Sequence, residues 1–138
     1  WAVYFENEQV LHTGDLFFNQ HYPNIDLEAG GSIRQWSSAI DQLLALDFKR
    51  VIPGHGATTN RAGLKQFQTF MNELWVLGET AARTGQSLKE AQINGWLQAD
   101  LGYEELGIPL VFRLDRDFVI QQAWLEANRY YEGNKRPK

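Results

Sequence analysis

The chain has 138 residues with 17 acidic and 13 basic side chains, which gives a formal net charge of -4. It is too apolar, at 43% hydrophobic residues, for a disordered chain, and its acidic balance provides no basic field for nucleic acid or anionic lipid. It has no cysteine, which excludes disulfides and thiolate metal ligands, and no apolar run approaches the roughly 18 residues of a membrane span.

The first predicted elements are two short strands. Residues 2–5 and 9–12 are rich in β-branched and aromatic residues and flank a polar turn, which predicts a β-hairpin. Residues 13–15, Thr-Gly-Asp, are expected to end the second strand, and the apolar residues 16–18 to continue as buried backbone. Residues 19–31 contain proline and glycine and predict a loop.

A helix is predicted next, from Ser32 to about residues 46–47. Ser32 and Gln35 fit a capping box, and apolar residues at helical spacing follow them. Residues 50–52 are β-branched and predict a short strand, which we expect Pro53 to stop because proline cannot donate to a ladder.

The rest of the chain is predicted to be mainly helical. One helix runs from Ala62 to a terminator at Gly85, and a second capping box, Ser87 with Glu90, opens a helix to about residue 98. Residues 102–109 are expected to be irregular. Asp117 is the expected cap of a last helix that ends at Gly133, followed by a polar, frayed tail over residues 134–138.

These elements give an α/β fold class, with a small mixed β-sheet and a covering helix over residues 1–60. Residues 61–138 form a helical extension that packs on this unit. The sequence shows no internal repeat and no low-complexity segment.

Two polar loops follow predicted strands, and they carry Asp15 and His55. Asp after glycine is common in turns, and a loop histidine is commonly a surface residue, so each has a structural interpretation. The glycines around His55 also allow its ring to point into a cleft. Both residues follow the carboxyl end of a strand, which is where open α/β sheets bind ligands. A carboxylate and an imidazole that converge there suit zinc.

The segments HTGDLFF, GGSIRQWSSAIDQLLALDF and VIPGHG together resemble the second half of the metallo-β-lactamase fold superfamily of hydrolases. The resemblance covers residues 1–60. It implies the C-terminal half of an αβ/βα sandwich and a dinuclear zinc site, in which Asp15 bridges two metal ions and His55 binds one. It also implies a small-molecule substrate with an ester, thioester or lactam-like bond, which a metal-bound hydroxide attacks.

The first ligands of that superfamily, from a His-x-His-x-Asp-His motif and a later histidine, are absent. Trp1 rather than Met stands first and leads directly into strand-like sequence. We therefore expect this chain to be the C-terminal fragment of a longer hydrolase, inactive alone and with little or no bound zinc. Its partner would be the missing N-terminal half, and the exposed sheet would favour homodimers or domain swapping.

The remaining polar candidates are weaker. His12 is interpreted as a packing residue, with an outer contact to the metal site as the alternative. The loop after Asp15 borders the substrate entrance in the superfamily that the chain resembles, so Asn19, His21 and Tyr22 are candidate substrate contacts, although we expect His21 to face solvent.

Other functions stay open at this stage. Ser32 lacks the Gly-x-Ser-x-Gly context of a serine hydrolase, and the glycines before it lack the lysine of a P-loop. The main alternative is a non-catalytic helical interaction module with a vestigial metal site. It would use the tryptophans of the helical part, Trp75, Trp96 and Trp124, which we otherwise expect to pack in the core.

Overall fold

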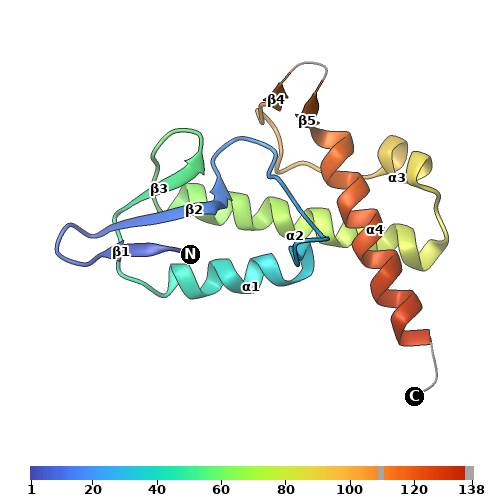
Figure 1. Ribbon diagram of the computed structural model, residues 1–138, viewed down its shortest axis with the longest axis horizontal. Coiled ribbons are helices and arrows are strands. Elements are labelled where there is room, and N and C mark those ends of the chain that lie inside the picture. Colours follow the sequence, from blue (N-terminus) through green and yellow to red (C-terminus); the bar gives the residue numbers. More distant parts are fainter. Residues whose placement is uncertain (109–110, 136–138) are drawn as a thin grey trace.

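A computed structural model describes residues 1–108 and 111–135. A three-stranded sheet is built from β1 (Val3–Phe5), β2 (Val10–Phe18) and β3 (Arg50–His55), in the order β1-β2-β3. β1 and β2 form the predicted antiparallel hairpin, and β2 and β3 pair in parallel. The crossover that a parallel pair requires contains α1 (Ile33–Leu44), as Figure 1 shows.

Both strands that lead to the candidate residues run further than predicted. β2 does not end at residues 13–15. Gly14 adopts a positive φ of 53° and the pairing register shifts there, as in a β-bulge, and the strand continues past this point to Phe18. β3 does not stop at Pro53, which pairs with Gly14. β3 lies at the edge of this sheet, where a residue without an N–H is tolerated.

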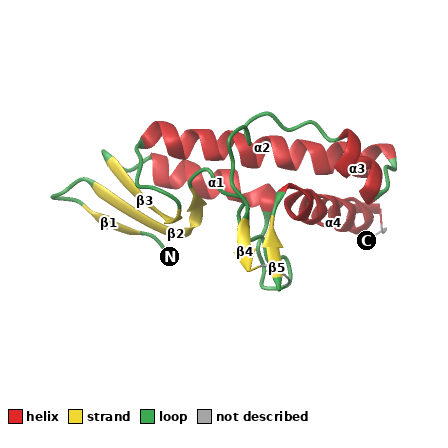
Figure 2. Cartoon of the chain, turned by 90° about the horizontal axis from the view of Figure 1, so that it is seen from above, coloured by secondary structure: helices red, strands yellow, loops and turns green. Residues whose placement is uncertain are grey.

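Two helices cover one face of the sheet, as the view from above shows (Figure 2). α1 lies beside α2 (Arg61–Thr84), and the ring of Phe67 on α2 packs against both Phe17 and Trp36. Arg61 donates to the carbonyl oxygens of Leu44 and Leu46 at 2.5 and 2.7 Å. These two carbonyl groups lie at and just after the end of α1, where helix geometry leaves carbonyl oxygens without a partner in the helix. The start of α2 is therefore fixed to the end of α1.

The start of α1 is capped from a distant part of the chain. Ser32 is the N-cap as predicted, and its Oγ accepts from the N–H of Gln35 at 3.2 Å. Glu126, rather than the predicted Gln35, provides the second acceptor at the start of α1. Its carboxylate accepts from Ser32 Oγ at 2.5 Å and from the N–H of Ile33 at 2.7 Å. α1 ends at Leu44, two or three residues earlier than predicted.

The predicted caps of the next two helices are confirmed. α2 ends at Gly85, which has the left-handed conformation, and Ser87 forms a capping box with Glu90. α3 (Leu88–Asn94) is shorter than predicted and ends before Gly95. A side chain on Gly95 would meet Leu77 Cδ1 at 2.5 Å, so a glycine allows this turn to lie against α2.

The last segment differs more from prediction. The stretch expected to be irregular contains β4 (Leu106–Ile108), which pairs with β5 (Phe112–Leu114). α4 (Arg116–Lys135) begins before Asp117, and Asp115 is the residue whose Oδ1 accepts from Phe118 N–H. Residues 134–135 are helical, contrary to the predicted frayed tail; Pro109 and residues 136–138 lie outside the described residues.

The second face of the sheet is uncovered in the described residues. Val3 and Phe5 are 52% and 49% exposed, and His12 on the same face is exposed as well. The opposite face carries Leu11 and Val51, both fully buried under the helices. None of the helices in the described ranges combines the length and apolar character that a bilayer crossing needs.

Candidate metal centre

The two residues that the sequence singles out come together. Asp15 lies within β2, one residue after the bulge at Gly14, and His55 is the last residue of β3. The distance from Asp15 Oδ1 to His55 Nε2 is 3.4 Å. The carboxylate side chain is 71% exposed and the imidazole 46%, so both are open to a ligand.

Three contacts fix the position of His55. Its ring stacks on the fully buried Phe18 with centroids 4.7 Å apart and planes at 16°. The N–H of Asn19 donates to His55 O at 2.9 Å, and the Asn19 side-chain amide donates to Ala57 O at 2.8 Å. Gly56 has a φ of 89°, and a Cβ there would lie 3.1 Å from the Asn19 carbonyl carbon. The loop is therefore held against the end of β2.

The approach of the two strands depends on Gly54. A Cβ on Gly54 would lie 2.7 Å from the carbonyl carbon of Gly14 and 2.8 Å from its oxygen, and closer still to Asp15 Oδ1. Real Cβ atoms essentially never come so near to backbone atoms. A glycine at this position therefore allows the carboxylate and the imidazole to share one space.

The spacing of the two donor atoms fits a zinc ion. Two ligand atoms bound at about 2.0–2.1 Å to a tetrahedral zinc lie about 3.3 Å apart. The observed 3.4 Å is close to this value and longer than the roughly 2.7–2.9 Å of a charge-assisted hydrogen bond. Within residues 1–108 and 111–135, however, no group of three or more potential ligand side chains gathers in one place.

A cavity of about 370 Å³ opens beside Asp15. Its wall includes Trp36, whose indole N–H donates to Leu16 O at 2.9 Å, and the turn at Gly30. The other lining residues come from the same loop and from α1: Asn24, Asp26, Ala29, Gly31, Ser32, Gln35 and Ala39. A cavity of this size is within the range of small-molecule sites.

The other residues that the sequence suggested, His12, His21 and Tyr22, have hydrogen-bond partners other than Asp15 and His55. His12 is exposed and its Nδ1 accepts from Gly14 N–H, so the prediction that it packs in the core is wrong. His21 is half-buried and lies 3.4 Å from Glu104 O. Tyr22 is 7% exposed, and its hydroxyl donates to Asp100. Burial and that hydrogen bond raise the pKa of Tyr22 far above its ordinary value.

Two residues at the centre have roles that the sequence analysis did not assign, although Gly54 was noted there as a neighbour that frees the His55 ring. Phe18 supports the imidazole, and Gly54 brings the strands close enough. The signal for both was present, because Phe18 ends an apolar run directly after Asp15 and Gly54 is part of the Pro-Gly-His-Gly sequence. Neither pattern, however, indicates that Phe18 and Gly54 lie at the same site as Asp15 and His55.

A carboxylate and an imidazole that meet across two parallel strands are ligand types that zinc sites use. Residues 1–55 match the model of the metallo-beta-lactamase superfamily. The match confirms the superfamily relationship that the sequence predicts, over this part of the chain.

Curated relatives match as well. An uncharacterized protein of Mycobacterium leprae (strain TN) is 35% identical over 66 residues, which cover 47% of this chain and 30% of the relative. Uncharacterized proteins of Mycobacterium bovis and of Mycobacterium tuberculosis (strain H37Rv) are 32% identical over 69 residues, or 49% of this chain and 31% of each relative. The match therefore spans about a third of the length of these curated relatives.

Proposed function

We propose that the full-length protein is a metal-dependent hydrolase, with a dinuclear zinc site in which Asp15 and His55 are ligands. The observation that carries this proposal is their 3.4 Å separation, with Asp15 within β2, His55 at the end of β3 and both side chains exposed. When bound, zinc supplies Lewis acidity for the cleavage of an ester, thioester or lactam-like bond. In this function Phe18 and Asn19 are positioning residues that hold the imidazole toward the carboxylate.

The other ligands would come from an N-terminal half outside this chain. A catalytic zinc ion uses about three protein ligands, and the described residues bring two together. Such a half has a surface to pack on, because Val3, Phe5 and His12 lie on the uncovered face of the sheet. A second sheet on this face would complete the αβ/βα sandwich. Without it, the chain would be inactive and would associate through the same face.

The cavity beside Asp15 is the proposed substrate site. It contains the bulky apolar wall of Trp36 together with the polar side chains of Asn24 and Gln35, which suits a small molecule with apolar and polar parts. His21 stays a predicted substrate contact, but it does not line this cavity and its Nδ1 lies 3.4 Å from Glu104 O. Asn19 and Tyr22 would act on the substrate only indirectly, because Asn19 holds the His55 loop and Tyr22 is buried.

Metal analysis of the full-length protein tests the proposal. After dialysis, mass spectrometry of the wild type should find about two zinc ions per chain. Asp15→Ala should lose most of this zinc together with ester and thioester hydrolysis, and His55→Ala should lose about one ion. Glu8→Ala, which removes an exposed carboxylate from the β1–β2 turn, is the matched control and should keep both. Wild-type zinc content in Asp15→Ala would show that the ligand assignment is wrong.

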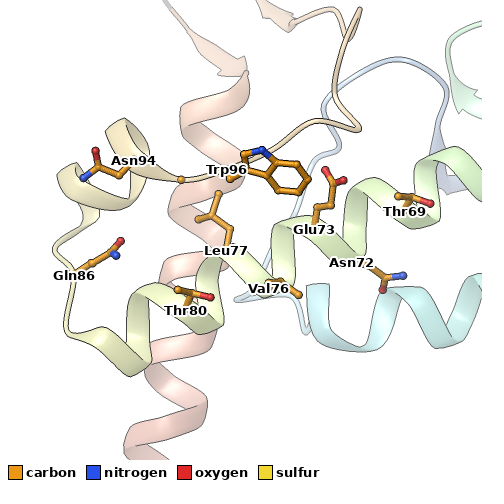
Figure 3. A pocket seen from close by; sticks show the side chains of 10 residues that line it. Thr69, Asn72, Glu73, Val76, Leu77, Thr80, Gln86, Asn94 and Trp96 are labelled. Carbon is orange, nitrogen blue, oxygen red and sulfur yellow. The ribbon is translucent and has the colours of Figure 1, made fainter.

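A folded full-length protein without zinc would instead favour the second function, a non-catalytic helical interaction module with a vestigial metal site. One observation favours it. Trp75 and Trp124 are half-buried against the core, but Trp96 is 65% exposed, contrary to the expected core packing. Trp96 lines a groove of about 440 Å³ along α2 (Figure 3), and an exposed tryptophan beside a groove is a feature of binding surfaces.

A further inference from the structure

The cavity beside Asp15 contains a second carboxylate, that of Asp26. Among the described residues that line it, none is a lysine, an arginine or a histidine, and the rest are apolar or uncharged. In the proposed function Asp15 is a zinc ligand, so the metal offsets its charge. Asp26 is therefore the carboxylate of this wall that remains for a substrate.

Asp26 is held in place by the turn that it opens. Its Oδ1 accepts from the N–H of Ala29 at 3.0 Å, and its carbonyl oxygen accepts from the N–H of Gly31 at 2.8 Å. A Cβ on Gly31 would lie 3.1 Å from the carbonyl carbon of Asp26, so a glycine allows this tight turn. Asp26 Oδ2 has no hydrogen-bond or ion-pair partner within the described residues, and the side chain is exposed.

The start of α1 belongs to the same wall, because Ser32 lines the cavity. A helix N-terminus ordinarily attracts an anion, since its first N–H groups point outward without a partner. Here the carboxylate of Glu126 already occupies that place, accepting from Ser32 Oγ at 2.5 Å and from Ile33 N–H at 2.7 Å. A carboxylate or phosphate on a substrate would find these donors taken and would meet another negative charge.

The basic side chain that contacts this segment is already paired. Arg129 on α4 donates to Glu28 at 2.8 Å. It lines a neighbouring cavity of about 240 Å³, which Asp26 also borders, and not the cavity beside Asp15. The charge of Arg129 is therefore offset by Glu28, and the cavity beside Asp15 keeps its negative character.

Trp36 gives the cavity an aromatic wall that is fixed in orientation. Its indole N–H donates to Leu16 O at 2.9 Å, and its ring meets Phe67 edge-on, with the planes at 75°. Tryptophan is the aromatic residue that attracts cations most strongly. One cavity therefore holds a carboxylate and an indole, two groups that favour a positively charged nitrogen.

From this charge pattern we infer that the substrate carries a positively charged nitrogen, for which Asp26 selects; this rests on the proposed function, in which Asp15 binds the metal. The carbonyl group of the scissile bond would lie at the zinc ions, and the cationic group would lie in the cavity near Asp26 and Trp36. Substrates with a carboxylate or phosphate in that position would react poorly, because like charges repel.

The test compares three thioesters of similar shape on the full-length protein. Their acyl groups are γ-trimethylammoniobutyryl, the isostere in which carbon replaces the nitrogen, and glutaryl, and a second set carries the three charges on the thiol instead. A chromogenic disulfide follows thiol release. In one of the two sets, kcat/KM for the cationic thioester should exceed that for the uncharged isostere by about three- to ten-fold, and that for the anionic thioester by more. The preference should shrink in about 0.5 M salt, which screens exposed charges.

Asp26→Asn removes the charge and keeps an Oδ1 that can accept from Ala29 N–H, so the turn is preserved. In this variant the preference for the cationic thioester over its uncharged isostere should fall below about two-fold. Glu8→Gln is the matched control. It removes an exposed carboxylate from the β1–β2 turn, outside the cavity, and should keep the preference of the wild type.

A binding measurement separates this selectivity from the proposed function. Benzyltrimethylammonium, which has no bond to hydrolyse, is titrated calorimetrically into the full-length wild type and both variants. It should bind the wild type and Glu8→Gln equally, and Asp26→Asn at least about three-fold more weakly. If this holds while zinc and hydrolysis are absent, the proposed hydrolase is wrong and the cation site stands.

Three outcomes would overturn the inference even in a zinc-loaded, active hydrolase. They are an anionic thioester hydrolysed as well as the cationic one, a wild-type preference that survives in Asp26→Asn, and benzyltrimethylammonium that fails to bind or binds Asp26→Asn as tightly as the wild type. Circular dichroism of both variants checks that they are folded.

Discussion

Replacing Gly54 by alanine tests whether the close approach of β2 and β3 creates the candidate centre. The added Cβ would stand 2.7 and 2.8 Å from the carbonyl carbon and oxygen of Gly14. To reach ordinary contact at 3.4 Å, the oxygen of Gly14 must retreat by about 0.6 Å, and Asp15 Oδ1 must move further because it is closer. Because these are backbone atoms of a paired strand, the movement must separate the strands or rotate the Asp15 carboxylate away.

The expected cost of this overpacking is about 1–3 kcal/mol in the free energy of unfolding. Urea denaturation of the full-length protein measures it. The same variant should bind zinc at least about ten-fold more weakly, because a ligand displaced by about 1 Å no longer fits a metal geometry that tolerates only a few tenths of an ångström. A competition assay with a chromogenic chelator measures this affinity.

Gly133→Ala is the matched control. Gly133 lies in α4, is exposed, and has no atom within 4 Å of its added Cβ. Alanine should stabilise the helix there by about 0.5–1 kcal/mol and leave zinc affinity unchanged. If Gly54→Ala kept both the stability and the zinc affinity of the wild type, the strand approach would not control the position of Asp15.

Two further predictions concern the part of the chain that supports the centre. Glu126→Ala should lower the free energy of unfolding by about 2–3 kcal/mol, because it removes the acceptor of Ser32 Oγ and of the first N–H of α1; a change below about 0.5 kcal/mol in urea denaturation would contradict this role. Tyr22 has a folded pKa raised above its unfolded value of 10.0 by burial and by its hydrogen bond to Asp100. The stabilisation that the protonated Tyr22 hydroxyl gives the folded state is therefore complete below pH 10 and is lost as the pH rises further. The free energy of unfolding should fall between pH 10 and 11, and it should fall less steeply in Tyr22→Phe.

Local signals in the sequence predicted the helices well. The end of α2 and the start of α3 follow from local residues, Gly85 in the left-handed conformation and Ser87 with Glu90 in a capping box. The end of α3 was not predicted, because the helix stops at Asn94 rather than near residue 98. The start of α1 was predicted only in part, because the group that completes its cap is Glu126, 94 residues from Ser32. A cap that comes from so far along the chain leaves no local pattern.

The strand ends were predicted less well, for a related reason. Gly14 and Pro53 are both signals for the end of a strand, but here they face each other across one irregular pair and the ladder continues past them. Where β2 and β3 end depends on how the two strands pair, and the sequence of one segment alone does not indicate that pairing. The convergence of Asp15 and His55 was nevertheless predicted, because the sequence places their two strands side by side. The parallel pairing of β2 and β3 brings the two side chains together although β2 continues past Asp15 to Phe18.

The helical part of the chain also shapes the surroundings of the centre. Glu104 pairs with the loop after β2, donating its N–H to Gln20 O at 2.8 Å and accepting from Tyr22 N–H at 3.4 Å. Glu126 fixes the start of α1, which is one wall of the cavity beside Asp15. The boundary at residue 60 stays a prediction. The positions of Asp15 and His55 are set by contacts within residues 1–57, whereas the cavity beside Asp15 depends on residues from both parts.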